Sequence, residues 1–163
     1  MNNATRTRGL ALILAFAGAA TAPFASAEIK AQDGWARATT PGATVGAAYL
    51  TLANSGDTER KLLKITSPVS DAVSLHRTSM TAQGVSRMWP LAVLAVEPGQ
   101  TLRMEPGGVH VMFTALRQPL VAGQKVPLTM KFDGGEPEFT LLLEVRPLVP
   151  GADDQAHAGG HKH

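Results

Sequence analysis

Two side chains that favour soft metal ions lie close together in the second half of the sequence. His110 and Met112 are separated by one residue within the apolar run Val109–Phe113. Alternate residues of a β-strand point to the same face, so we expect their Cα atoms about 7 Å apart on one side of a strand. The valines and the phenylalanine of this run then face the core. One strand therefore offers an imidazole nitrogen and a thioether sulfur at one place.

A second pair of such residues comes earlier in the chain. His76 lies in the run Ala72–Ser79, where apolar residues alternate with polar ones, and Met88 follows a turn at Gly84. This pattern predicts a β-hairpin that carries His76 on one arm and Met88 on the other. Met80 is the alternative thioether ligand on this hairpin.

Imidazole and thioether groups together favour a soft ion of low charge. A thioether is neutral and polarizable; it binds copper(I) well and offers little to zinc, calcium or magnesium. Two of each group would surround a monovalent ion without adding charge, so the ion can leave by stepwise ligand exchange. The predicted copper(I) ligands are His76, Met88, His110 and Met112. The methionines at 104 and 130 are predicted to fill the core instead.

The sequence gives little support for catalysis at this site. Apart from Glu105, no Asp or Glu is spaced with either histidine as an acid–base partner, and there is no Ser-His-Asp set or zinc motif. A catalytic metal site needs such groups, so we expect a protein that is not an enzyme. Two other functions stay open. The first is copper scavenging or resistance in the periplasm, and the second is a metal-free exported β-sandwich that binds other proteins.

Residues 1–27 have the pattern of a secretory signal peptide. Two arginines precede an apolar run at 9–20, and Ala25-Ser26-Ala27 supplies the small residues for cleavage before Glu28. The apolar run is shorter than the roughly 20 residues that span a membrane. We therefore expect export to the periplasm, removal of the leader, and no membrane insertion afterwards.

The composition excludes several classes of protein. The sequence contains no cysteine, which excludes disulfides, thiolate chemistry and a blue-copper centre, and predicts that there is no lipid-anchored form. The 15 Lys and Arg residues, less the two in the leader, balance the 13 Asp and Glu residues. A neutral chain without a clustered basic face is not expected to bind nucleic acid.

After the leader, short β-rich runs recur about every ten residues and no convincing helix appears. Turn signals such as Pro98-Gly99, Pro106-Gly107-Gly108 and Asp133-Gly134-Gly135 separate the runs. This pattern predicts one all-β domain at 28–149, built as a Greek-key sandwich or barrel. The predicted strands are 29–39, 45–53, 61–66, 72–79, 85–89, 101–104, 109–116, 126–132 and 139–146.

Residues 150–163 differ from the rest of the chain because they carry no large apolar side chain. We expect a disordered tail. Its three histidines, His157, His161 and His163, have two aspartates nearby. Nitrogen and oxygen donors of this kind suit copper(II), so the tail is predicted to capture that ion weakly.

The ligand spacing His76-x11-Met88-x21-His110-x-Met112, with Pro106-Gly107-Gly108 just before the second histidine, resembles the signature of the periplasmic copper chaperone family PCu(A)C. The likeness extends over residues 35–146 and includes Gly46-Ala47-Ala48-Tyr49. In this sequence the first spacer is one residue longer than in the family pattern. We expect the turn at 81–84 to absorb the extra residue.

The resemblance implies a cupredoxin-like β-sandwich that binds copper(I) at an exposed site. It also implies delivery of copper during assembly of the dinuclear copper centre of cytochrome c oxidase. The partner would then be subunit II of that oxidase or another copper chaperone. We expect a monomer, because a site that transfers copper must stay open to its partner.

Overall fold

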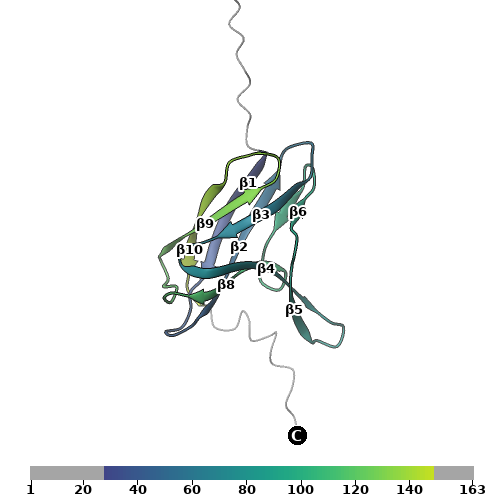
Figure 1. Ribbon diagram of the computed structural model, residues 1–163. Helices are drawn as coiled ribbons and strands as arrows, with labels where there is room; N and C mark the ends of the chain where they lie inside the picture. Colours follow the sequence, from purple (N-terminus) through teal and green to yellow (C-terminus); the bar gives the residue numbers. More distant parts are fainter. Residues whose placement is uncertain (1–27, 149–163) are drawn as a thin grey trace, which may run out of the picture.

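The computed structural model describes residues 28–148, and all its regular elements are β-strands (Figure 1). Within this range no helix is long and apolar enough to cross a membrane. The strands are β1 Ile29–Arg37, β2 Val45–Asn54, β3 Arg60–Thr66, β4 Ser70–Met80, β5 Ser86–Pro90, β6 Ala95–Val96, β7 Thr101–Arg103, β8 Val109–Leu116, β9 Lys125–Phe132 and β10 Phe139–Arg146. The predicted all-β class is confirmed.

Each predicted strand is present, with bounds that differ by at most two residues. The sequence analysis missed β6, which has only two residues and is defined by its pairing with Arg60 and Lys61 of β3. An alternating pattern cannot be recognised over so short a strand. The predictions for the leader at 1–27 and the tail at 150–163 lie outside the described residues.

The strands form one continuous ladder in the order β5-β4-β8-β2-β1-β10-β9-β3-β6, and β7 pairs with β2. Strand β8 lies between β4 and β2, so neighbours in space are far apart in the chain, as in Greek-key folds. The first and last strands, β1 and β10, are parallel to each other, with Trp35 opposite Glu144. All strand pairs other than β1–β10 are antiparallel.

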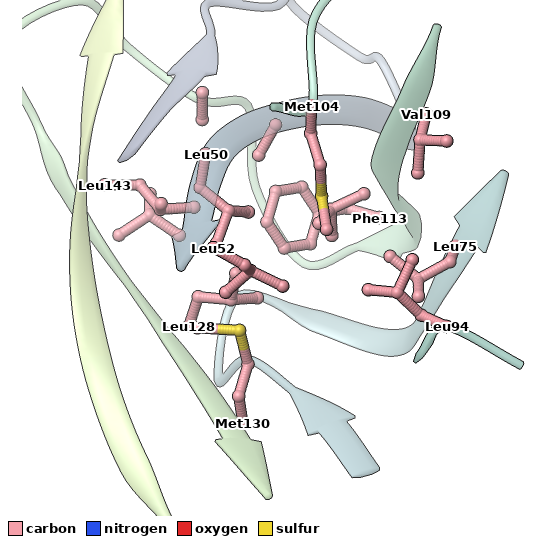
Figure 2. Packing of buried hydrophobic residues seen from close by; sticks show 14 of the residues in the cluster. Leu50, Leu52, Leu75, Leu94, Met104, Val109, Phe113, Leu128, Met130 and Leu143 are labelled. Carbon is pink, nitrogen blue, oxygen red and sulfur yellow. The ribbon is translucent and has the colours of Figure 1, made fainter. Parts of the chain in front are cut away.

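One apolar core lies between the two halves of this ladder (Figure 2). Its members come from strands on both sides and include Leu50, Leu52, Phe113, Leu128 and Leu143, each at most 2% exposed. Met104 and Met130 are 5% and 1% exposed and belong to the same cluster, which confirms that they fill the core. On β8 the alternation is as predicted, because Val111 and Phe113 are fully buried in the core.

Adjacent residues of β10 provide a test of this core. Leu143 is fully buried, whereas its neighbour Leu142 is 56% exposed. We expect Leu143→Ala to lower the free energy of unfolding by about 2–5 kcal/mol, because it removes buried methyl groups and leaves a cavity. The matched change Leu142→Ala should alter that free energy by less than about 0.5 kcal/mol. Urea unfolding of both variants measures the difference, and equal losses would contradict the described alternation.

Candidate metal centre

The pairing of β4 with β8 brings the two histidines of the domain together. His76 is directly opposite His110, and Ser74 is directly opposite Met112. Residues that oppose each other in an antiparallel pair point to the same side of the sheet. The two imidazole ring centroids are 6.1 Å apart. Both rings and the thioether of Met112 therefore share the face that points away from the core.

Met88 reaches the same face from the edge strand β5. It is directly opposite Thr78 of β4, two residues along the strand from His76, and side chains two residues apart in a strand share a face. Met88 is thus a diagonal neighbour of His76, at about 7–8 Å, within reach of a long side chain. The turn of this hairpin contains Gly84 with a φ of 77°, as predicted.

Met80 shares this face but lies farther along the hairpin. It is opposite Ser86, near the turn. Four residues separate it from His76 along β4, which corresponds to about 13 Å of strand. Met80 is also not among the residues that line the pocket beside Met88. The register therefore favours Met88 as the ligand from this hairpin, and its assignment stays a prediction.

A pocket of about 440 Å³ opens next to three of the predicted ligands. Met88, His110 and Met112 form one side of it, and the chain from Arg37 to Ala47 together with Leu148 forms the other. His110 is only 8% exposed, whereas Met88 is 52% exposed. A metal ion held here would be anchored on a buried imidazole and accessible from the side of the exposed thioether.

Hydrogen bonding sets the orientation of the His110 ring. Its Nδ1 lies 3.1 Å from the carbonyl oxygen of Gly108, in the turn before β8. With the Nδ1 hydrogen donated to that oxygen, the lone pair is on Nε2, which is free to bind a metal ion. Ligating histidines in metal sites are commonly oriented by such a bond from the other ring nitrogen.

An aromatic layer covers the other side of His110. The Tyr49 ring centroid is 6.3 Å from that of His110 and 4.5 Å from that of Trp35. The guanidinium of Arg146 lies over the Trp35 ring at 5.1 Å, as in a cation–π contact. Burial raises the pKa of Tyr49, so its phenol stays protonated at neutral pH. This layer explains why His110 is buried although it faces away from the core.

His76 has one ring nitrogen that the protein leaves without a partner. Its Nε2 lies 3.2 Å from the hydroxyl oxygen of Ser74, but its buried Nδ1 has no hydrogen-bond partner among residues 28–148. A buried polar nitrogen without a partner is unfavourable. A metal ion bound to Nδ1 would remove this penalty, which agrees with the predicted role of His76 as a ligand.

The donor set also indicates which metal ions fit. In the described part of the chain, no group of three or more His, Asp or Glu side chains is arranged to hold a metal ion. A site here must therefore use the thioethers of Met88 and Met112 beside the two imidazoles. Such a mixture of soft and borderline donors fits copper(I) better than zinc or a hard cation.

The sequence analysis missed the surroundings of these residues. Ala47 is opposite Met112, and its small side chain leaves space where the pocket lies. Leu148, at the end of the described chain, lines the same pocket. Small residues at 46–48 were the available signal, but they could be placed beside Met112 only once β2 was known to pair with β8.

A model of the LpqE-like family, described as "Putative lipoprotein LpqE-like", matches residues 29–141. The chain belongs to this family. A relative in Leifsonia xyli subsp. xyli, named "Putative lipoprotein Lxx21020", is 33% identical over 134 residues, which cover 77% of this chain and 79% of the relative.

Solved structures extend the assignment to PCu(A)C domains. The copper-bound PCuAC domain from PmoF2 has a TM-score of 0.63 and 24% identity, covering 77% of this chain and 97% of that domain. The solution structure of CuI-DR1885 from Deinococcus radiodurans has a TM-score of 0.54 and 29% identity, covering 69% of this chain and 74% of that protein. The predicted PCu(A)C family and its cupredoxin-like fold are confirmed.

The environment of His76 leads to a prediction about pH for this LpqE-like protein without copper. Burial, and then the charge of His110, lower the pKa of His76 below its usual 6.5. Below about pH 6.5 the unfolded chain binds a proton that the folded chain excludes, so the stability supplied by neutral His76 falls as the pH drops.

NMR titration of the imidazole C–H signals of the copper-free protein measures this pKa. We expect His110→Gln to move the pKa of His76 part of the way back toward 6.5, since it removes the repulsion between the two protonated imidazoles and leaves the burial unchanged. Lys131→Gln, which removes a charge on β9, serves as the control and should leave the titration of His76 unchanged. A His76 pKa above 6.5 in the unmodified protein would contradict this account.

Proposed function

We propose that this protein binds one copper(I) ion outside the cytoplasm and passes it to another copper protein. The observation that carries the proposal is the shared face of β5, β4 and β8, where two imidazoles and two thioethers converge. The ligands are His76, Met88, His110 and Met112. All four are uncharged when they bind, so a monovalent ion is held by neutral soft and borderline donors.

The uneven burial of the ligands supports a carrier over an enzyme. His110 is nearly buried and holds its orientation through Gly108, whereas Met88 lies exposed on an edge strand. A ligand from an acceptor can therefore replace Met88 first while the imidazoles still hold the ion. The nearest candidate acid–base group, Glu105, is an exposed residue of the turn before β8, which gives no reason to propose catalysis.

The relatives support copper as the cargo and export as the location. One structural match is a copper-bound domain and another is a copper(I) form, and the relative in Leifsonia carries a lipoprotein name. We place this protein in the periplasm, after cleavage of the leader before Glu28, as a monomer. The destination that we propose is the dinuclear copper centre of cytochrome c oxidase, reached through subunit II or another copper chaperone.

The tail histidines would add a second, weaker function with copper(II). Leu148 lines the pocket of the copper(I) site, so the chain beyond it starts beside that site. Nine residues lead from Leu148 to His157, and they can span up to about 30 Å. His157, His161 and His163 are therefore within reach of the site, which favours capture of copper near it. The same histidines favour scavenging as the second candidate function.

Copper(I) competition against a chromophoric chelator tests the ligand assignment. We expect the double variant His110→Ala/Met112→Ala to lose affinity by more than about 100-fold, since changes that merely disturb a metal ligand already cost 10–100-fold. Met88→Leu should lower the affinity clearly, whereas the matched change Met80→Leu on the same hairpin should not. Equal losses for these two methionine variants would contradict the assignment of Met88.

In the same experiment, the wild-type protein tests whether the protein can be a copper(I) carrier at all. If it cannot compete for copper(I) at all, the carrier function is wrong. The metal-free interaction module then remains, and metal analysis of protein purified from a copper-supplemented periplasm would confirm it by finding no copper.

Deletion of the gene distinguishes delivery from scavenging. If the protein delivers copper, cytochrome c oxidase activity should fall in the deletion strain at low copper and recover when copper is added, because free copper replaces the carrier. Normal oxidase activity together with reduced copper tolerance would show that scavenging is the function. Complementation with the His110→Ala/Met112→Ala variant is the control, and it should not restore activity.

A further inference from the structure

The hairpin formed by β4 and β5 has an unusual distribution of charge. Between residues 72 and 96 the sequence contains two arginines and no Asp or Glu. Arg77 directly follows the ligand His76, and Arg87 directly precedes the ligand Met88. Both side chains are exposed, and neither forms an ion pair within residues 28–148. Two positive charges without an ion-pair partner among residues 28–148 therefore lie on the hairpin, each adjacent in sequence to a proposed ligand.

Exposed apolar side chains gather at the same place. Of the ten large hydrophobic side chains that are exposed in the described chain, four lie on the hairpin and two more line the pocket beside it. These six are Met80, Val85, Met88, Trp89, Val45 and Leu148. An apolar patch of this kind with charged residues among it is typical of a binding surface, and Trp and Arg often dominate the energy of such surfaces.

The strand pairing leaves both faces of the hairpin accessible. Met88 is on the face of the metal centre. Arg77 and Trp89 oppose each other on the reverse face, and Arg87, opposite Ser79, is on that reverse face too. Strand β5 is the last strand of the ladder, so no strand among residues 28–148 pairs with its outer edge, and Figure 1 shows it at one side of the molecule. A partner that covers this edge of β5 can therefore contact Met88 on one face and Arg87 and Trp89 on the other.

Several carboxylates lie at the other end of the molecule, where β1 and β3 begin, and basic side chains accompany them there. Glu28 forms an ion pair with Arg60 there. It lies far from the pocket, which is next to Arg37 at the opposite end of β1. Asp133 and Glu136 bond to the backbone of Lys61 and Glu28 at that same end. Between residues 72 and 96 the hairpin itself carries two arginines and no carboxylate, and Glu105 of the neighbouring turn is the acidic residue next to it.

We propose that the copper acceptor docks on this hairpin through an acidic surface. Its carboxylates would meet Arg77 and Arg87, while apolar side chains cover Met80 and Trp89 and bring the acceptor's own ligand to Met88. This inference rests on the proposed carrier function and adds the chemistry of the partner. Opposite charges on two surfaces raise the rate of association, and salt screens the effect.

Two synthetic acceptor peptides test the proposal. Both contain the same methionines and histidines, and one is flanked by glutamates while the other is flanked by lysines. The copper(I)-loaded full protein is mixed with each peptide, and the rate of transfer is followed by stopped flow. At low salt we expect transfer to the acidic peptide to be faster by about tenfold or more. The ratio of the two rates should approach one near 1 M salt, where the Debye length is about 3 Å.

Charge reversal on the hairpin gives the decisive comparison. Arg77→Glu/Arg87→Glu should invert the preference so that the lysine-flanked peptide receives copper faster. The control Lys30→Glu/Lys131→Glu changes the net charge equally, on exposed residues of β1 and β9, and should keep the wild-type preference. The neutral variant Arg77→Gln/Arg87→Gln, which disturbs folding less, should abolish the preference without inverting it.

The copper(I) affinity of each variant separates this proposal from the carrier function. Neither arginine is a ligand, so competition with the chelator should give unchanged affinities. If the wild-type protein did not bind copper(I) at all, the carrier function itself would be overturned. Unchanged affinity together with an unchanged peptide preference in both arginine variants would overturn the docking surface alone. The arginines would then serve only to keep the edge of β5 from pairing with other strands.

Discussion

The register of β4 against β8 is the constraint on which the metal centre depends. His76 opposes His110 only because Leu75 opposes Val111 one residue away, and those two side chains are buried in the core. A slip of one residue would turn every side chain of a strand to the other face. It would bury imidazole and expose leucine, so the hydrophobic effect opposes it. The buried side chains thereby fix the strand register, and the register fixes the position of the proposed ligands on the opposite face of the sheet.

The same ladder sets how firmly each ligand is held. Strand β8 has neighbours on both sides, and the aromatic layer of Tyr49 and Trp35 packs against its histidine. Strand β5 has one neighbour, so Met88 can shift with the hairpin at little cost to the rest of the sheet. Firm binding and release are therefore assigned to different strands. For the proposed carrier, this division would allow one site both to hold copper(I) and to give it up.

Local patterns in the sequence predicted the parts of this arrangement that depend on neighbouring residues. Alternation along β8 placed His110 and Met112 on one face, and the turn at Gly84 predicted the hairpin that carries Met88. The observed turn lies between Met80 and Ser86, in the segment where we expect the longer spacer to be absorbed. Each of these features depends on a pattern that extends over about ten consecutive residues.

Contacts between distant segments could not be predicted in this way. The pairing of β4 with β8 was not predicted, because alternation does not reveal which strands are neighbours. The burial of His110 depends on Tyr49 of β2, and the pocket depends on Leu148 at the end of the described chain. The two-residue strand β6 is recognisable only beside β3. Tertiary packing, not local sequence, decides each of these features.

The parallel pairing of β1 with β10 has a practical consequence for work with this protein. Because the first and last strands run in the same direction, Glu28 begins the fold at one end and Leu148 leaves it at the other, beside the pocket. An oligohistidine purification tag at the C terminus would be joined through residues 149–163 to Leu148, beside the pocket, and its imidazoles would compete for copper. A tag placed before Glu28 would leave from the far end, so copper measurements should use that design.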